Sequence, residues 1–160
     1  MRDTCIGASP PRAPGTLLIS IPDPATFLET YDAKISDDGR YVAFTGAVRM
    51  RDEFDPFVDV WFRDTCLGAP PSCVAVTRKL TTSPTGMDAD SFSDFFLGGM
   101  SADARYVAFN SNATNLAPVH EDTIHAFITD TCIGATVPCT ASVQTIPVVF
   151  YVSLFLRRRK

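Results

Sequence analysis

Four of the five cysteines form two equally spaced pairs, and these are the residues whose types and spacing point most directly to chemistry. Cys66 is separated from Cys73 by six residues, and Cys132 is separated from Cys139 by the same number. Each pair brackets a turn-forming segment, so a hairpin would place its two sulfur atoms opposite each other, within reach of a disulfide. The spacing predicts two disulfides, each stabilising the fold by about 2 to 3 kcal/mol.

Two alternatives for these cysteines stay open. Zinc sites usually space their cysteines by about two to four residues, and pairs in different repeats would point apart, which disfavours zinc. The other alternative is that the thiols are buried and unpaired.

Cys5 has no partner at the same spacing, because Arg12 stands there. Two disulfides indicate an oxidising location, which means the periplasm, the cell surface or the secreted fraction.

Acidic side chains cluster in segments that we expect to form loops between strands. Asp52, Asp55 and Asp59 are a candidate calcium set, because calcium prefers carboxylate and carbonyl oxygens. The segment lacks the glycine and the regular spacing of an EF-hand loop, and a solvated acidic loop is the alternative. The other acidic positions of this kind are Glu53, Asp88, Asp90, Asp94, Glu121 and Asp122. Calcium is the one cofactor that the sequence leaves open.

The sequence offers little for enzyme chemistry or for nucleic acid. It contains no Gly-x-Ser-x-Gly segment, and its only histidines, His120 and His125, lack the His-Glu-x-x-His spacing of a zinc protease. We interpret both as surface residues beside a strand and predict that the chain is not an enzyme. With a net charge of -4 and scattered basic residues, it is not expected to bind nucleic acid.

Two motifs recur in the same order along the chain. Arg-Asp-Thr-Cys-Leu-Gly-Ala at 63–69 has close copies at 2–8, which is 61 residues earlier (63 − 2), and at 129–135, which is 66 residues later (129 − 63). Between these copies, Ser-x-Asp-x-Arg-Tyr-Val-Ala-Phe occurs at 36–44 and again at 101–109. Unlike motifs that recur together indicate a tandem array of one supersecondary unit.

Strand signals dominate each unit. Residues 40–45 and 105–111 are apolar on both faces and predict central strands that are covered on both sides. Residues 58–62 and 124–128 alternate and predict a half-exposed second strand. The other expected strands lie at 30–35, 73–80, 94–100 and 139–144. Four short strands per unit make an antiparallel meander, and the fold class is therefore all-β, as in a β-propeller of tandem four-stranded blades.

The segments 36–44 and 101–109 resemble the Ser-x-Asp-Gly-x-x-x-Ala-Phe core of the WD40-like repeats of TolB-type β-propellers. The Asp-Thr-Cys-x-Gly-Ala motif and residues 110–116 are similar to those of a bacterial, extracytoplasmic branch with six or more blades. The resemblance covers residues 1–144 and implies a fold rather than an activity. Ala104 stands where Gly39 stands in the other copy, and a positive φ costs alanine about 1 kcal/mol, so the second turn is expected to be strained or of another type.

The repeats divide the chain into a partial blade at 1–30, complete blades at 31–94 and 95–144, and an atypical apolar and basic tail at 145–160. Two complete units are few for such an array, so we interpret the chain as a fragment and expect the rest of the propeller to be missing. The apolar stretch of the tail has 11 residues (146–156), too few for a membrane span. A displaced or frame-altered terminus, a propeller strand and a membrane anchor are the three interpretations, and membrane association is the least favoured.

These features predict a non-enzymatic β-propeller scaffold or binding module outside the cytoplasm, with an unidentified protein or cell-envelope partner. Two alternatives stay open. The first alternative is that the chain is the propeller portion of a larger hydrolase or peptidase whose catalytic domain it lacks. The second is that it is a truncated product without a function of its own.

Overall fold

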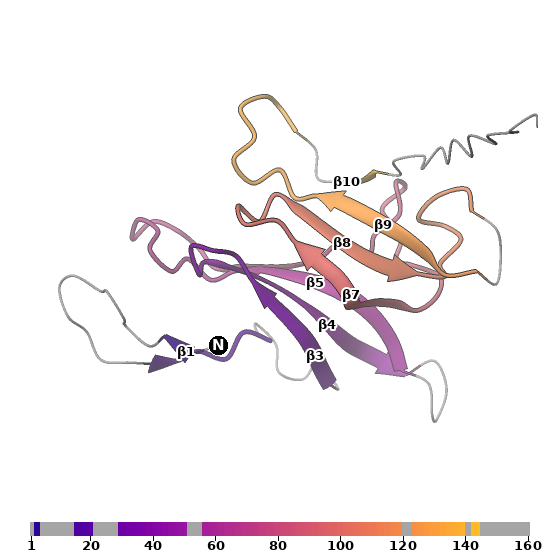
Figure 1. Ribbon diagram of the computed structural model, residues 1–160, viewed down its shortest axis with the longest axis horizontal. Helices are drawn as coiled ribbons and strands as arrows, with labels where there is room; N and C mark the ends of the chain where they lie inside the picture. The colour runs from indigo at the N-terminus through magenta and orange to yellow at the C-terminus, as the bar shows by residue number, and fades with distance from the viewer. Residues whose placement is uncertain are drawn as a thin grey trace, which may run out of the picture.

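The computed structural model describes residues 2–3, 15–20, 29–50, 56–119, 123–139 and 142–144. These residues form ten strands and no helix (Figure 1), which confirms the all-β class. None of the described segments is a helix long and apolar enough to cross a membrane.

The strands form two four-stranded antiparallel sheets and one short pair. The first sheet contains β3 (Glu29–Ile35), β4 (Tyr41–Met50), β5 (Pro56–Asp64) and β6 (Val76–Lys79). The second contains β7 (Ser93–Met100), β8 (Tyr106–Ser111), β9 (His125–Asp130) and β10 (Ser142–Gln144). The short pair is β1 (Arg2–Asp3) with β2 (Gly15–Thr16).

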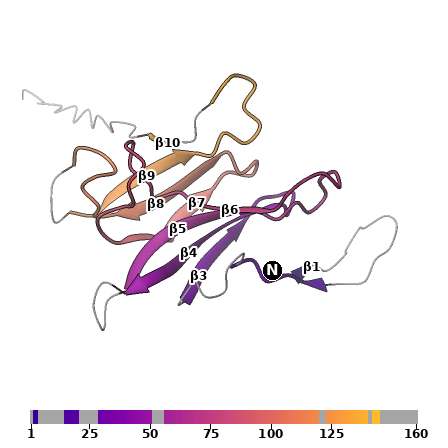
Figure 2. The same ribbon diagram turned by 180° about the vertical axis from the view of Figure 1, so that it is seen from behind.

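Each four-stranded sheet is a meander in which strand order follows chain order. Neither sheet closes on itself within the described residues. Figures 1 and 2 both show the short pair to the side of β3. Four strands per repeat, joined by short turns, are what the sequence predicts; the third strand of the first repeat begins at Val76 rather than at Cys73, because the residues before it belong to the disulfide turn.

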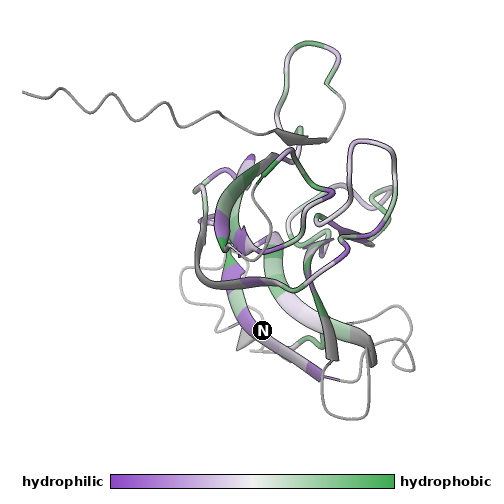
Figure 3. Cartoon of the chain, turned by 90° about the vertical axis from the view of Figure 1, so that its right-hand side faces the viewer, coloured by the Kyte–Doolittle hydropathy of each residue, from purple (hydrophilic) through white to green (hydrophobic). Residues whose placement is uncertain are grey.

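The core lies between the two sheets. One face of the first sheet presents Tyr41, Ala43, Val60 and Phe62 to the second repeat. The second sheet contributes Val107, Phe109 and Phe127 to the same core. Stacked rings occur on both sides, with centroids 5.7 Å apart for Tyr41 and Phe62 and 5.6 Å apart for Phe109 and Phe127. Figure 3 shows green, hydrophobic stretches on the strands of both sheets.

One prediction for the second strands needs correction. The second strand of the first repeat is not half exposed, because Val58, Asp59 and Val60 on β5 are all buried in a sheet that is covered on both faces. On β9 the expected alternation and half exposure are present, since Phe127 is buried and Ala126 is exposed. The inward phase is set by which face meets the first sheet, and alternation alone does not specify that face.

The central strands also differ from each other. In β4, Tyr41 to Phe44 are all buried, as predicted. In β8, Val107 and Phe109 are buried, but Tyr106 is 42% exposed. The prediction that β8 is covered on both sides is therefore wrong for one face, because no equivalent of the second sheet packs against it among the described residues.

Candidate functional site

Both repeats build the same polar turn before their central strand. The Ser36 hydroxyl donates to Asp38 Oδ1 (2.6 Å) and accepts the Tyr41 N–H (3.0 Å), and Asp38 Oδ1 also accepts the Arg40 N–H (3.0 Å). Gly39 completes the turn with a φ of +75°. Short polar side chains that bond to the nearby backbone stabilise such turns. The recurrence of Ser-x-Asp-x-Arg is thus explained by local structure.

The second repeat reproduces this turn with alanine in place of the glycine. Ser101 donates to Asp103 (2.6 Å), and Asp103 accepts the Arg105 N–H (3.0 Å). The hydrogen bond from the Ser101 hydroxyl lowers the pKa of Asp103, assisted by the Arg105 N–H. Ala104 adopts a φ of +61°, so the turn is of the same type and carries the strain, while its methyl group is 0% exposed.

A bidentate ion pair joins each turn to the far end of the neighbouring strand. Arg40 donates from Nε and Nη2 to the two Asp64 oxygens, at 2.8 and 2.7 Å. These bonds lower the pKa of Asp64 despite the opposing effect of burial. The equivalent pair is Arg105 with Asp130, at 3.1 Å between Nη2 and Oδ2. Burial alone would raise the pKa of Asp130, but the bonds from Arg105 and from the Cys132 N–H lower it.

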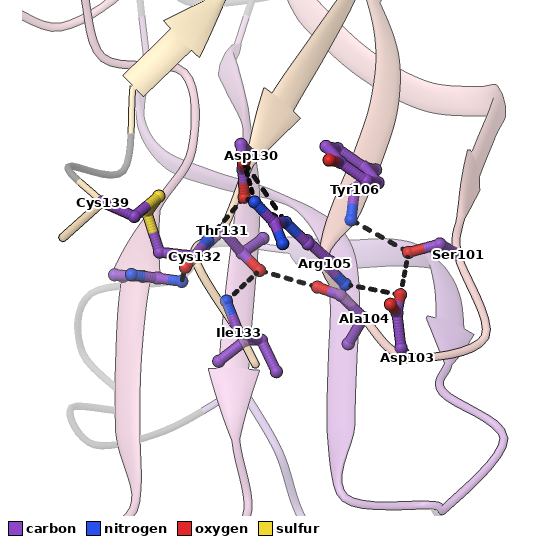
Figure 4. A network of polar contacts seen from close by, with 11 residues as sticks. Ser101, Asp103, Ala104, Arg105, Tyr106, Asp130, Thr131, Cys132, Ile133 and Cys139 are labelled. Carbon is purple, nitrogen blue, oxygen red and sulfur yellow. Dashed lines mark hydrogen bonds and ion pairs between the residues drawn. A yellow bond between two sulfur atoms is a disulfide. The ribbon is translucent and has the colours of Figure 1, made fainter. Parts of the chain in front are cut away.

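The same aspartates also shape the cysteine turns. Asp64 Oδ1 accepts the Cys66 N–H at 2.8 Å, and Asp130 Oδ1 accepts the Cys132 N–H at 2.8 Å. The intervening threonine hydroxyl donates back to the turn before the central strand, from Thr131 to the Ala104 carbonyl at 2.7 Å. Figure 4 shows this network in the second repeat, where the two motifs meet.

Both predicted disulfides are present. The Cα atoms are 5.8 Å apart in Cys66–Cys73 and 5.7 Å apart in Cys132–Cys139. The sulfur atoms of each pair lie at bonding distance, 2.06 and 2.03 Å, as the disulfide interpretation predicts. Cys66 and Cys132 both have a positive φ, at +58° and +62°, which their sequence gave no means of predicting. We call the whole assembly of turn, ion pair, threonine and disulfide the clasp. In the first repeat it consists of Ser36, Asp38, Arg40, Asp64, Thr65, Cys66 and Cys73, and in the second of Ser101, Asp103, Arg105, Asp130, Thr131, Cys132 and Cys139.

The clasp does not offer a metal site. In each copy a carboxylate oxygen and the two sulfur atoms lie within 4.8 Å of one another. The carboxylate is bonded to an arginine, however, and the sulfur atoms are consumed by the disulfide. A metal ion needs deprotonated, unpaired ligands, and the clasp presents none.

One calcium candidate, Asp59, lies on a strand rather than in the expected loop. Asp59 lies on β5, 1% exposed, with Lys79 Nζ at 2.8 Å and the Thr81 hydroxyl donating to it at 2.6 Å. Its carboxylate therefore belongs to a buried ion pair. Asp52 and Asp55 lie outside the described residues, as do Glu53, Glu121 and Asp122.

The second acidic set is engaged within the fold. Asp88 forms an ion pair with Lys79 at 3.0 Å. The two Asp90 oxygens accept bonds from the Thr114 N–H (2.8 Å) and hydroxyl (2.7 Å), which tie two loops together. Burial opposes the shift, but these bonds lower the pKa of Asp90. Asp94 is half-buried on β7.

Other predicted residues have simpler placements. His125 is half-buried at the start of β9. His120, Cys5 and the tail at 145–160 lie outside the described residues.

Sequence reasoning did not find the bonds between the repeats. Arg78 Nη2 donates to the Thr131 carbonyl at 2.7 Å, and its guanidinium lies 5.1 Å from the centre of the Phe62 ring. The Asp37 N–H donates to the Ala102 carbonyl at 3.0 Å. The sequence places Arg78 on a predicted strand at 73–80, and an arginine on a strand is too common to be diagnostic.

A half-open pocket of about 290 Å³ lies where the N-terminal segment meets the first sheet. Its lining residues are Leu17, Leu18, Ile19, Ser20, Thr30, Tyr31, Asp32, Ala33 and Phe44. It is lined largely by apolar side chains, with few polar groups, which suits contact with an apolar group better than catalysis.

Comparison with known proteins finds no matching family model and no match among curated proteins or solved structures. The chemistry of the site therefore has to be judged from the geometry alone. In the clasp, the polar groups that the two repeats share are bonded to one another.

Proposed function

We propose that the chain is a non-enzymatic scaffold or binding module, built from propeller-type repeats and working outside the cytoplasm. One observation carries the proposal: the side chains that recur in both repeats are used in the clasp. A recurring catalytic group would be aimed at open space with its reactive atom available, whereas these carboxylates, hydroxyls and sulfur atoms are already paired.

The architecture supports a repeat scaffold. Two successive meanders, each in chain order, pack face to face through a shared apolar core. Successive blades of a β-propeller are related in this way, and the Ser-x-Asp-x-Arg motif resembles that of the TolB-type repeats. Such scaffolds present loops at the blade ends, and it is these loops, together with the pocket beside Phe44, that we assign to partner contact.

The two disulfides support a location outside the cytoplasm, because reducing compartments keep cysteine thiols reduced. The test is to produce the chain in the periplasm and, separately, in a reducing cytoplasm, and to count blocked cysteines by alkylation and mass spectrometry. We expect four blocked cysteines and a cooperative unfolding transition only in the exported protein. A reduced cytoplasmic protein with the same transition would contradict the proposed location.

The non-enzymatic part is tested with the exported protein against fluorogenic esters, peptides, glycosides and phosphate esters. We expect no turnover above buffer, and we expect co-sedimentation with purified cell-wall sacculi or envelope-membrane vesicles that the reduced, unfolded chain does not show. Turnover that one substitution abolishes without loss of folding would overturn this part of the proposal.

A further inference from the structure

The pocket beside Phe44 is a largely apolar hollow that opens to solvent. Phe44 is 2% exposed in its wall, whereas Leu17 and Leu18, which the N-terminal segment contributes, are 37% and 62% exposed. Its volume of about 290 Å³ lies at the small end of the range for pockets that bind small molecules. The pocket therefore suits a compact ligand that carries an apolar group.

A bulge in β3 supplies the polar side of this pocket. The register of β3 against β4 shifts between Tyr31 and Lys34. In a regular strand successive side chains point to opposite faces, yet Tyr31, Asp32 and Ala33 all line the pocket. Asp32 has a φ of +54°, and it is the only charged residue among the described residues that line the pocket. The bulge thus brings an acidic residue and an aromatic one to the same largely apolar wall.

The charge around Tyr31 is negative. Burial has the largest effect on the pKa of the Tyr31 hydroxyl, which it raises. Three nearby carboxylates raise this pKa further, those of Glu29, Asp32 and Asp94. No lysine or arginine is among the described lining residues, and Lys34, which follows on β3, is exposed to solvent and does not line the pocket. A cation would therefore be attracted to this wall, and an anion would be repelled.

These properties together select one class of ligand. A neutral apolar ligand would take water from the half-buried Asp32 carboxylate and give it no partner in return. An ammonium group replaces that water with a charged hydrogen-bond donor, and it is also attracted to the face of an aromatic ring such as that of Tyr31.

We propose that the pocket beside Phe44 binds a small organic ammonium ion, with its charge beside Asp32 and its apolar group against Leu17 and Leu18. The proposed binding function is a premise of this assignment, because the pocket is one of the surfaces that we assign to partner contact.

The test titrates three probes of similar shape into the full, oxidised chain, and backbone amide signals in nuclear magnetic resonance spectra report both affinity and location. The probes are phenethylammonium, the neutral 2-phenylethanol and the anionic 3-phenylpropionate. We expect phenethylammonium to bind with a millimolar dissociation constant and to shift the signals of residues 17–20 and 30–33. We expect 2-phenylethanol to bind at least about fivefold more weakly, and 3-phenylpropionate to bind most weakly. Equal binding of the three probes, no binding of phenethylammonium, or shifts confined to other residues would overturn the proposal.

Asp32→Asn removes the charge with little change in shape, and asparagine tolerates the left-handed φ of this position. It should weaken the binding of phenethylammonium at least about threefold and leave that of 2-phenylethanol unchanged. Asp37→Asn is the matched control, because Asp37 is an exposed acidic residue in the turn after β3 and does not line the pocket. An equal loss in both variants would indicate attraction to the net charge of -4 rather than to a site, and would overturn the proposal.

Leu18→Ser tests the apolar wall. It should weaken the binding of phenethylammonium and 2-phenylethanol alike, at least about twofold, because both place their ring there. The amide spectra of all variants verify that they fold, and an unchanged affinity in folded Leu18→Ser would contradict the assignment of this wall. Failure of the probes would leave the co-sedimentation with sacculi or vesicles and the absence of turnover untouched, so the ligand and the proposed function can fail separately.

Discussion

Replacing Ala104 with glycine tests whether the second turn is strained. Alanine with a φ of +61° is disfavoured by about 1 kcal/mol relative to glycine, so Ala104→Gly relieves that cost. The methyl group is 0% exposed within the core between the sheets, and its removal costs about 0.8 kcal/mol. The two effects nearly cancel, and we expect a change in the free energy of unfolding of less than about 0.5 kcal/mol.

The reciprocal variant, Gly39→Ala, separates the two contributions. Gly39 has a φ of +75°, and a Cβ built there meets nothing within 4 Å, so alanine gains no packing and pays only the strain. We expect it to lower the free energy of unfolding by about 1 kcal/mol.

Both values come from urea unfolding followed by the fluorescence of Trp61, the single tryptophan, and by circular dichroism. Ala104→Gly stabilising the protein by more than about 1 kcal/mol would mean that the buried methyl contributes nothing. A loss of about 0.8 kcal/mol, the full cost of the missing methyl group, would mean that the left-handed turn costs alanine nothing. Either result would refute the reasoning.

Three further predictions concern the clasp and the buried ion pair. Replacing Cys66 and Cys73 together by serine should lower the free energy of unfolding by about 2.4 kcal/mol, from the closure of a short loop, and an unchanged urea midpoint would contradict this. Asp64 has a lowered pKa in the folded state, so its stabilising contribution is present above its ordinary value and is lost as the pH falls through the lowered one. Asp64→Asn should therefore flatten the loss of stability below about pH 4 and cost about 1 kcal/mol at neutral pH, as measured by thermal unfolding across pH. Lys79→Met should cost about 3 to 5 kcal/mol, because it leaves the Asp59 carboxylate buried, and the double variant with Asp59→Asn should recover part of that loss in urea unfolding.

Repetition is what made part of the fold predictable from the sequence. Equal spacing in two copies identified Cys66 with Cys73 and Cys132 with Cys139, and the turn motifs located the central strands. Both signals are local, because a short loop or a tight turn closes within a few residues. They do not depend on how the two sheets meet.

The parts that could not be predicted depend on packing between the sheets. Asp59 was a calcium candidate because of its acidic neighbours in the sequence. In the structure its buried carboxylate instead forms an ion pair with Lys79, which lies 20 residues later (79 − 59). Tyr106 reads like Tyr41 in the sequence but is exposed, because the neighbour that covers Tyr41 is the second sheet itself. Strand alternation marks two faces without saying what each of them contacts.

The clasp explains why the two motifs recur together. Arg40 and Asp64 are 24 residues apart along the chain, but antiparallel pairing puts Tyr41 opposite Asp64 and so brings both motifs to one end of the sheet. The aspartate then holds the arginine with its two oxygens and the cysteine N–H with one of them. If the arginine were lost, a partly buried carboxylate would lose its cation; if the aspartate were lost, the arginine and the N–H that begins the disulfide turn would lose their acceptor. A repeat that kept one motif without the other would therefore be less stable than a repeat with neither, and this coupling accounts for their shared recurrence without any catalytic role.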